Sequence, residues 1–281
     1  MSAARIALMG AIAGSTIFLG LPIGRLRAPM PRVRALLNAV AIGVLVFLLW
    51  DVLAHAWEPV DVALGAKKYA PALRDGLVLA AGVTVGLAGL VYFDRWIAQR
   101  AKARRAAVPA ESEAIATGEG SGTEVTGWHS PAAHLALLIA VGIGLHNFAE
   151  GLAIGSSAAA GELGLALLLV IGFGLHNGTE GFGIVAPLAA AGVRLSWARL
   201  ALLGVIGGGP TFLGTIIGQG FTNDTISVAF LALAAGSILY VVIELLAVGR
   251  KFAAKDVTTW GLLAGLLLGF ATDAIITAAG A

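Results

Sequence analysis

The sequence predicts an all-α integral membrane protein with eight transmembrane helices. Of its 281 residues, 58% are hydrophobic and only 12% are charged, whereas soluble domains carry about 25% charged residues. Apolar windows of about 20 residues, the length that spans a bilayer core as a helix, occur eight times along the chain. We therefore expect a multi-pass protein of the cell membrane (plasma or inner), surrounded by lipid and without a nucleic-acid partner.

The windows form a single transmembrane domain, residues 1–281. The first begins almost at Met1 and is long enough to cross the bilayer, and only "SSAAAGEL" separates the fourth from the fifth. This short connection predicts a tight antiparallel hairpin. In order, we expect helices at about 5–24, 35–54, 75–95, 133–156, 162–189, 199–219, 226–247 and 259–279.

One long polar segment, Arg95–Pro131, interrupts the apolar windows. It holds "RWIAQRAKARR" and then the acidic, small-residue stretch "ESEAIATGEGSGTEVTG". Such a composition cannot bury a core and is typical of disorder. We expect a flexible loop at 98–131, which divides the chain into three helices and then five.

The positive charges predict the orientation, because cytoplasmic loops carry an excess of Lys and Arg. With the N-terminus outside, 14 of the 18 basic residues fall in cytoplasmic segments, and the outer side keeps Arg5, Lys67, Lys68 and Arg74. We therefore expect both termini outside and the long loop in the cytoplasm.

Several polar side chains lie inside or at the edges of the predicted spans, where they are costly and by default functional. No Lys or Arg lies well inside any span to neutralise the carboxylates, so another cation is needed, either protons or a metal. The residues are Asp51, His55 and Glu58, then His146, Asn147 and Glu150, then His176, Asn177 and Glu180, and finally Glu244 and Asp273.

Two of these groups repeat one pattern, "HNFAEG" at 146–151 and "HNGTEG" at 176–181. Each His precedes its Glu by four positions, which places both side chains on one helix face about 6 Å apart. Two facing helices with such pairs resemble metal sites in helix bundles. Imidazole and carboxylate suit Zn²⁺, Fe²⁺, Mn²⁺ and similar ions, and no Cys is present to form a thiolate site. The glycines around both motifs predict close helix approach.

The remaining polar residues also allow simpler interpretations. The end of the second helix, with Asp51, His55 and Glu58, could simply be hydrated. Glu244 could hydrogen-bond Tyr240 one turn earlier, and Asp273 could only be hydrated near the outer surface.

The paired HN-x-x-EG motifs resemble those of the ZIP (Zrt-, Irt-like protein) metal transporters. "VFLLWDVLAHAWEPV" at Val46–Val60 is similar to the second helix of prokaryotic members, and "AAGSILYVVIELL" at Ala234–Leu246 to the family's seventh helix. The resemblance covers nearly the whole chain. It implies eight helices, both termini outside, a variable cytoplasmic loop after the third helix, and a homodimer.

The resemblance also implies the roles of individual residues. One metal position would use His146, Glu150 and Glu180, with Glu180 as a bridge to a second position at Asn147 and Asn177, with His176 nearby. Asp51 and His55 would relay ions, and Glu244 would assist.

Three residues depart from the family pattern. Ala149 and Thr179 stand where members often carry Pro. Thr211 stands where many carry a Glu that completes the second position, so that position is expected to be weak or absent.

We therefore expect a transporter, not an enzyme, that carries divalent metal ions, Zn²⁺ foremost and Fe²⁺, Mn²⁺ or Cd²⁺ as alternatives, toward the cytoplasm. Two other functions stay open from the residues alone. One is an intramembrane metal-dependent hydrolase, although neither HExxH nor GxSxG occurs. The other is a carrier of protons or monovalent cations.

Overall fold

The computed structural model describes residues 2–25, 31–106, 130–159, 161, 163–220, 224–251 and 255–278. Within these ranges the chain is helical and contains eight α-helices, which confirms the predicted class. They are α1 (Ala3–Ser15), α2 (Pro31–Gly65), α3 (Tyr69–Ala106), α5 (Pro131–Ala159), α6 (Leu163–Ala191), α7 (Trp197–Gly218), α8 (Asp224–Lys251) and α9 (Lys255–Ala278).

Most helices are longer than the apolar windows that predicted them. Over the described residues, seven helical segments have the length and hydropathy of membrane spans, and the first of them includes α1 and the short helices that follow it. The α6 helix is not among these seven, but with 29 residues it is the eighth long helical segment. The α3 helix continues to Ala106, beyond position 98 where the loop was predicted to begin. The Ala, Gln, Arg and Lys residues there are strong helix formers, which explains the extension. Residues 107–129 of the predicted loop lie outside the described part.

The sequence predicts one continuous helix for the first span, but in the structure this span is interrupted. The α1 helix ends at Ser15 and is followed by two short 3₁₀ helices, η1 (Thr16–Leu19) and η2 (Leu21–Arg25). Gly20 separates them, and a side chain there would meet the backbone of α6 at Gly178 and Phe182. The absence of a side chain at Gly20 therefore allows this part of the span to lie close against α6.

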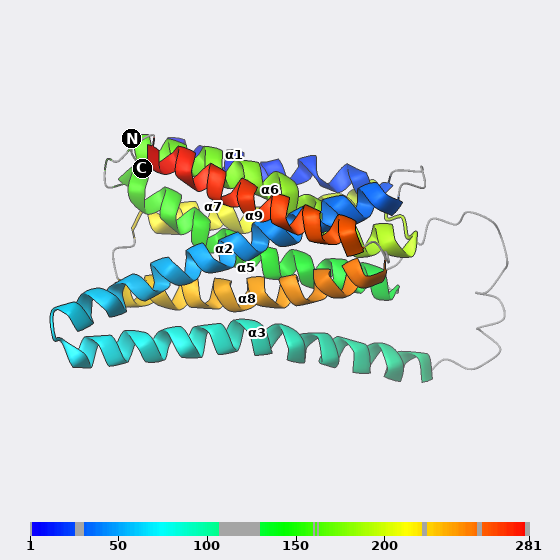
Figure 1. Cartoon of the computed structure of the whole chain (residues 1–281), viewed down its shortest axis with the longest axis horizontal. Helices are drawn as coiled ribbons and strands as arrows, with labels where there is room; N and C mark the ends of the chain where they lie inside the picture. The colour runs from blue at the N-terminus through cyan, green and yellow to red at the C-terminus, as the bar shows by residue number, and fades with distance from the viewer. Residues whose placement is uncertain are drawn as a thin grey trace.

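The helices pack in two groups. In the first, α1, α5, α6 and α7 contact one another, while in the second α2 contacts α3, α8 and α9, and α3 contacts α8. The groups meet where α5 packs on α8 and α6 on α2. The α5 helix is central, with 72% of its apolar window buried inside the protein, whereas α3 and α9 bury only 11% and 17% of theirs. In Figure 1, α3 runs along the edge of the bundle. The apolar surfaces of α3 and α9 are therefore left largely uncovered by the rest of the chain.

Glycines bring α5 and α7 into close contact. Any side chain at Gly151 or Gly155 of α5 would meet the backbone of α7, and any side chain at Gly214 or Gly218 of α7 would meet α5. Small residues are the usual way in which membrane helices approach closely. The close approach predicted from the glycines of the first motif is confirmed, although the partner helix is α7.

The ends of the helices agree with the predicted 3+5 arrangement. Figure 1 shows α1 beginning and α9 ending at the same end of the bundle, while α3 ends and α5 begins at the opposite end. Which of these ends faces the cytoplasm stays a prediction from the charges.

Candidate metal centre

The structure brings three of the predicted residues together between α5 and α6. The His146 Nε2 atom lies 2.9 Å from Glu150 Oε1 and 3.8 Å from Glu180 Oε1. The first distance follows from the four-residue spacing on α5, and the second shows that α6 directs its Glu toward the same imidazole. All three side chains are buried, with 1%, 5% and 1% exposure. The two motifs therefore contribute to one buried cluster.

Asn147 connects this cluster to α7. Its amide nitrogen donates to Glu180 Oε2 at 3.2 Å and to the carbonyl oxygen of Gly207 at 3.0 Å. The residue is fully buried. Glu180 is therefore held from both sides, since its other oxygen faces His146.

Asn177 is also fully buried, but its amide nitrogen donates to the carbonyl oxygen of Ala13 on α1, at 3.2 Å. This contact places Asn177 beside α1, and it is possible because α1 packs directly on α6. The side chain of His176 lies outside the described part of the structure, so its predicted role stays a prediction.

A cavity of about 600 Å³ connects the cluster with polar residues of the second and last helices. His146 and Glu150 line it, and so do three residues predicted as accessory, Asp51, His55 and Asp273. The His55 Nδ1 atom lies 2.9 Å from the Asp51 carbonyl oxygen and 3.4 Å from Asp51 Oδ1. These residues, far apart in sequence, line one cavity, most of whose wall is apolar.

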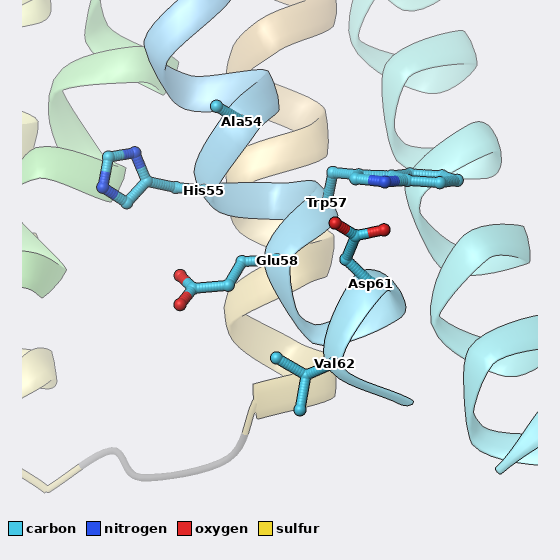
Figure 2. Close-up of a pocket in the computed structure, with 6 residues that line it drawn as sticks. All are labelled: Ala54, His55, Trp57, Glu58, Asp61 and Val62. Atoms are coloured by element: carbon cyan, nitrogen blue, oxygen red, sulfur yellow. The ribbon is translucent and has the colours of Figure 1, made fainter. Parts of the chain in front are cut away.

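Glu58 lies one turn beyond this cavity, at an open depression of about 620 Å³ on the surface of α2. Figure 2 shows His55 and Glu58 projecting to one side of α2, while Trp57 projects to the other side, toward α3. His55 borders both this depression and the internal cavity, so it stands at the junction between them.

Glu244 is partly exposed on α8 and does not line the cavity that reaches His146. Its suggested hydrogen bond to Tyr240 is not formed, because the buried Tyr240 hydroxyl has no hydrogen-bond partner among the residues that the structure describes. This simple explanation for Glu244 is therefore wrong.

The charge of the cluster determines what it can bind. Glu150 and Glu180 are buried carboxylates, and neither α5 nor α6 contains a Lys or Arg. Buried carboxylates need a cation or protons, because an isolated charge away from water is very unfavourable. Within the described residues, no three His, Asp or Glu side chains already stand in the geometry of a metal site. Instead, Glu150 lies at hydrogen-bond distance from His146, and this contact must open for a metal to bind both.

Two partners of the site were not identified from the sequence, because both are backbone carbonyl groups. They belong to Gly207 on α7 and Ala13 on α1. The run Gly207–Gly208–Gly209 before Pro210 is a signal that another helix approaches there. No pattern in the sequence marks Ala13.

In the part of the chain that the structure describes, eight α-helices and a buried His/Glu cluster define a multi-pass membrane protein with a candidate cation site in its interior. The model of the family described as ZIP zinc transporter matches residues 97–277, which extend from the last part of α3 through nearly all of α9. The chain belongs to the ZIP zinc transporter family, a family of transporters for divalent metals such as zinc and not of enzymes. No curated protein matches the sequence.

Proposed function

We propose that this protein carries a divalent metal ion, Zn²⁺ foremost, from the outside to the cytoplasm, and that His146, Glu150 and Glu180 bind the ion on its way. Fe²⁺, Mn²⁺ and Cd²⁺ suit the same donors. The observation that carries the proposal is the convergence of two buried carboxylates from different helices on one imidazole. Two carboxylates balance the charge of one divalent ion, and three ligands leave coordination positions open for release.

The neighbouring residues suit a supporting role. Asn147 positions Glu180 through its hydrogen bond, while Asn177 and His176 would line the adjacent position. Ions would reach the cluster along the cavity that Asp51, His55 and Asp273 line, with Glu58 at its outer margin and Glu244 assisting from α8. The ion would then be exposed to each side in turn, as the α5–α6 group moves against the remaining helices.

Metal uptake into proteoliposomes tests the proposal. The wild-type protein is expected to accumulate Zn²⁺ inside vesicles, and Glu180→Gln and His146→Ala are each expected to abolish uptake. Glu180→Gln keeps the size of the side chain and an oxygen for Asn147, so that it removes mainly the charge. Asp256→Asn, at an exposed position in the first turn of α9, is the matched control and should transport normally.

Unchanged uptake by both site variants would contradict the site. The remaining alternative is a carrier of protons or monovalent cations. An internal dye that reports pH or Na⁺ rather than Zn²⁺ would distinguish such a carrier from a metal transporter. If only protons or monovalent ions crossed the membrane, a carrier of those ions would replace a metal transporter.

A further inference from the structure

The cavity beside the metal cluster has an apolar wall that metal transport does not explain. Its volume of about 600 Å³ lies within the range of pockets that bind small organic molecules, roughly 300–1000 Å³. Most of the wall is apolar, and Phe173 and Leu268 are among the residues that line it. A metal ion gains nothing from such a surface, because it needs oxygen and nitrogen ligands. The apolar part of the wall is therefore available to another kind of ligand.

One face of α2 supplies both apolar and charged parts of this wall. Its lining residues recur at the i, i+3, i+4, i+7 spacing of a single helical face. They are Val44, Phe47, Leu48, Asp51, Val52 and His55. Asp51 lies one turn beyond Phe47 and two turns, about 10 Å, beyond Val44. A molecule with a charged group at Asp51 therefore has an apolar surface beside the rest of its length.

The α9 helix places a second carboxylate at the level of Asp51. The α2 and α9 helices run in the same direction (Figure 1), and glycines bring them into contact at intervals of four residues on each helix. The contacts are Gly261 with Ala39, Gly265 with Gly43 and Gly269 with Phe47. One further step of four residues along both helices pairs Asp51 with Asp273, and both residues line the cavity.

The cavity carries a net negative charge. Among the described residues, its lining includes the carboxylates of Asp51, Glu150 and Asp273, the imidazoles of His55 and His146, and no Lys or Arg. With ionised carboxylates, the net charge is negative even when both imidazoles are protonated. Such a cavity suits a cation that carries apolar groups, because its charge meets the carboxylates while the apolar groups lose contact with water.

The aromatic ring of Phe47 offers a fixed surface to such a cation. The ring centroid lies 4.9 Å from that of Phe270 in an edge-on arrangement, and a side chain at Gly269 would collide with the Phe47 ring. Packing on α9 therefore holds the ring in place. Aromatic faces attract ammonium groups within about 6 Å. Because Phe47 and Asp51 are one turn apart on the same face of α2, one ammonium group can contact both.

We propose that this cavity binds an organic ammonium cation with a compact apolar body. The ammonium group lies between Asp51 and Asp273, and the body lies against the apolar residues of α2 and α9. His146 and Glu150 line the same cavity, so the bound cation obstructs the approach of a metal ion to them. This last consequence rests on the proposed function, whereas the binding itself does not.

Three compounds of one shape test which charge the cavity selects. They are 1-adamantylamine, a cation at neutral pH, neutral 1-adamantanol and anionic 1-adamantanecarboxylate. Calorimetric titration of the purified, metal-free full chain in detergent measures their binding, with empty micelles as the blank. The amine is expected to bind saturably and at least about tenfold more tightly than the alcohol, since close charge pairs at desolvated sites contribute at least that factor. The carboxylate should not bind.

Variants of the two aspartates locate the binding. Asp273→Asn, which keeps the size of the side chain, is expected to remove most of the preference for the amine and to leave alcohol binding unchanged. Asp51→Asn should act in the same direction. The matched control is Asp256→Asn, at an exposed position in the first turn of the same helix, which should keep the full preference. A loss that affects amine and alcohol equally would indicate a structural role and overturn the proposed contacts.

Two further results would overturn the inference. One is equal binding of the amine and the alcohol, because the cavity would then accept any apolar molecule. The other is the absence of saturable amine binding. In the Zn²⁺ uptake assay, the amine should slow uptake and the alcohol should not. An amine that binds as expected but leaves uptake unchanged would contradict the proposed path of the metal ion, and not the proposed ligand.

Discussion

At the scale of single residues, the chemistry depends on how each polar side chain is held. His146 and Glu150 share one helix face by spacing alone, whereas Glu180 is brought to them by packing and is fixed by Asn147. Asp51 does not contact this cluster within hydrogen-bond distance, but it lies in the wall of the cavity that His146 and Glu150 also line. Its role is therefore expected in access and not in holding the ion.

Replacing Asp51 tests this distinction. Asp51→Asn removes a negative charge from the path, and charges that line a cleft typically raise association rates by about 10–1000-fold. The initial rate of Zn²⁺ uptake at low salt is expected to fall about tenfold, with a smaller loss at high salt, while the equilibrium Zn²⁺ Kd changes little. Stopped-flow uptake and calorimetry measure the two quantities. A Kd that weakens as much as the rate would place Asp51 among the ligands.

At the scale of helices, the position of the site depends on the close contact between α5 and α7. Gly151 follows Glu150 directly, and any side chain there would meet the carbonyl oxygen of Thr211. The close contact between α5 and α7 thus lets Asn147 reach Gly207. One turn further along α5, at Gly151, the same contact leaves no space for a methyl group.

Gly151→Ala tests the role of this contact. Alanine favours helices more than glycine does, yet the overpacking is expected to lower the free energy of unfolding by about 1–3 kcal/mol. Gly89→Ala, on α3 where a Cβ would meet no other atom within 4 Å, is the control and should be neutral or slightly stabilising. Thermal unfolding in detergent compares the two. Equal stability would show that α5 and α7 can separate without cost.

At the scale of the whole molecule, the bundle has two ends, and the distribution of Lys and Arg predicts which one faces the cytoplasm. The turn between α2 and α3 should lie on one side of the membrane, and the segment between α6 and α7 on the other. Three helices, α3, α5 and α6, separate them along the chain, and an odd number of crossings ends on the opposite side. The expected homodimer stays a prediction from the family resemblance.

Because the chain contains no Cys, single cysteines report this orientation directly. Ala66→Cys, in the turn after α2, is expected to react with a membrane-impermeant maleimide added to intact cells. Ser196→Cys, directly before α7, should react only after the membrane is permeabilised. The reverse pattern would invert the topology and, with it, the proposed direction of transport.

The sequence alone determined the helical membrane class, the number of long helices in the described part of the chain and the pairing of His146 with Glu150 on one helix face. These follow from hydrophobic length, helical spacing and the rarity of charge inside a bilayer, all of which are local properties. Only the tertiary structure decided that Glu180 turns toward His146 while Asn177 turns toward α1, and that the first span breaks at Thr16. Such contacts depend on the rotation and separation of helices far apart in sequence, which are set by packing and which no local pattern encodes.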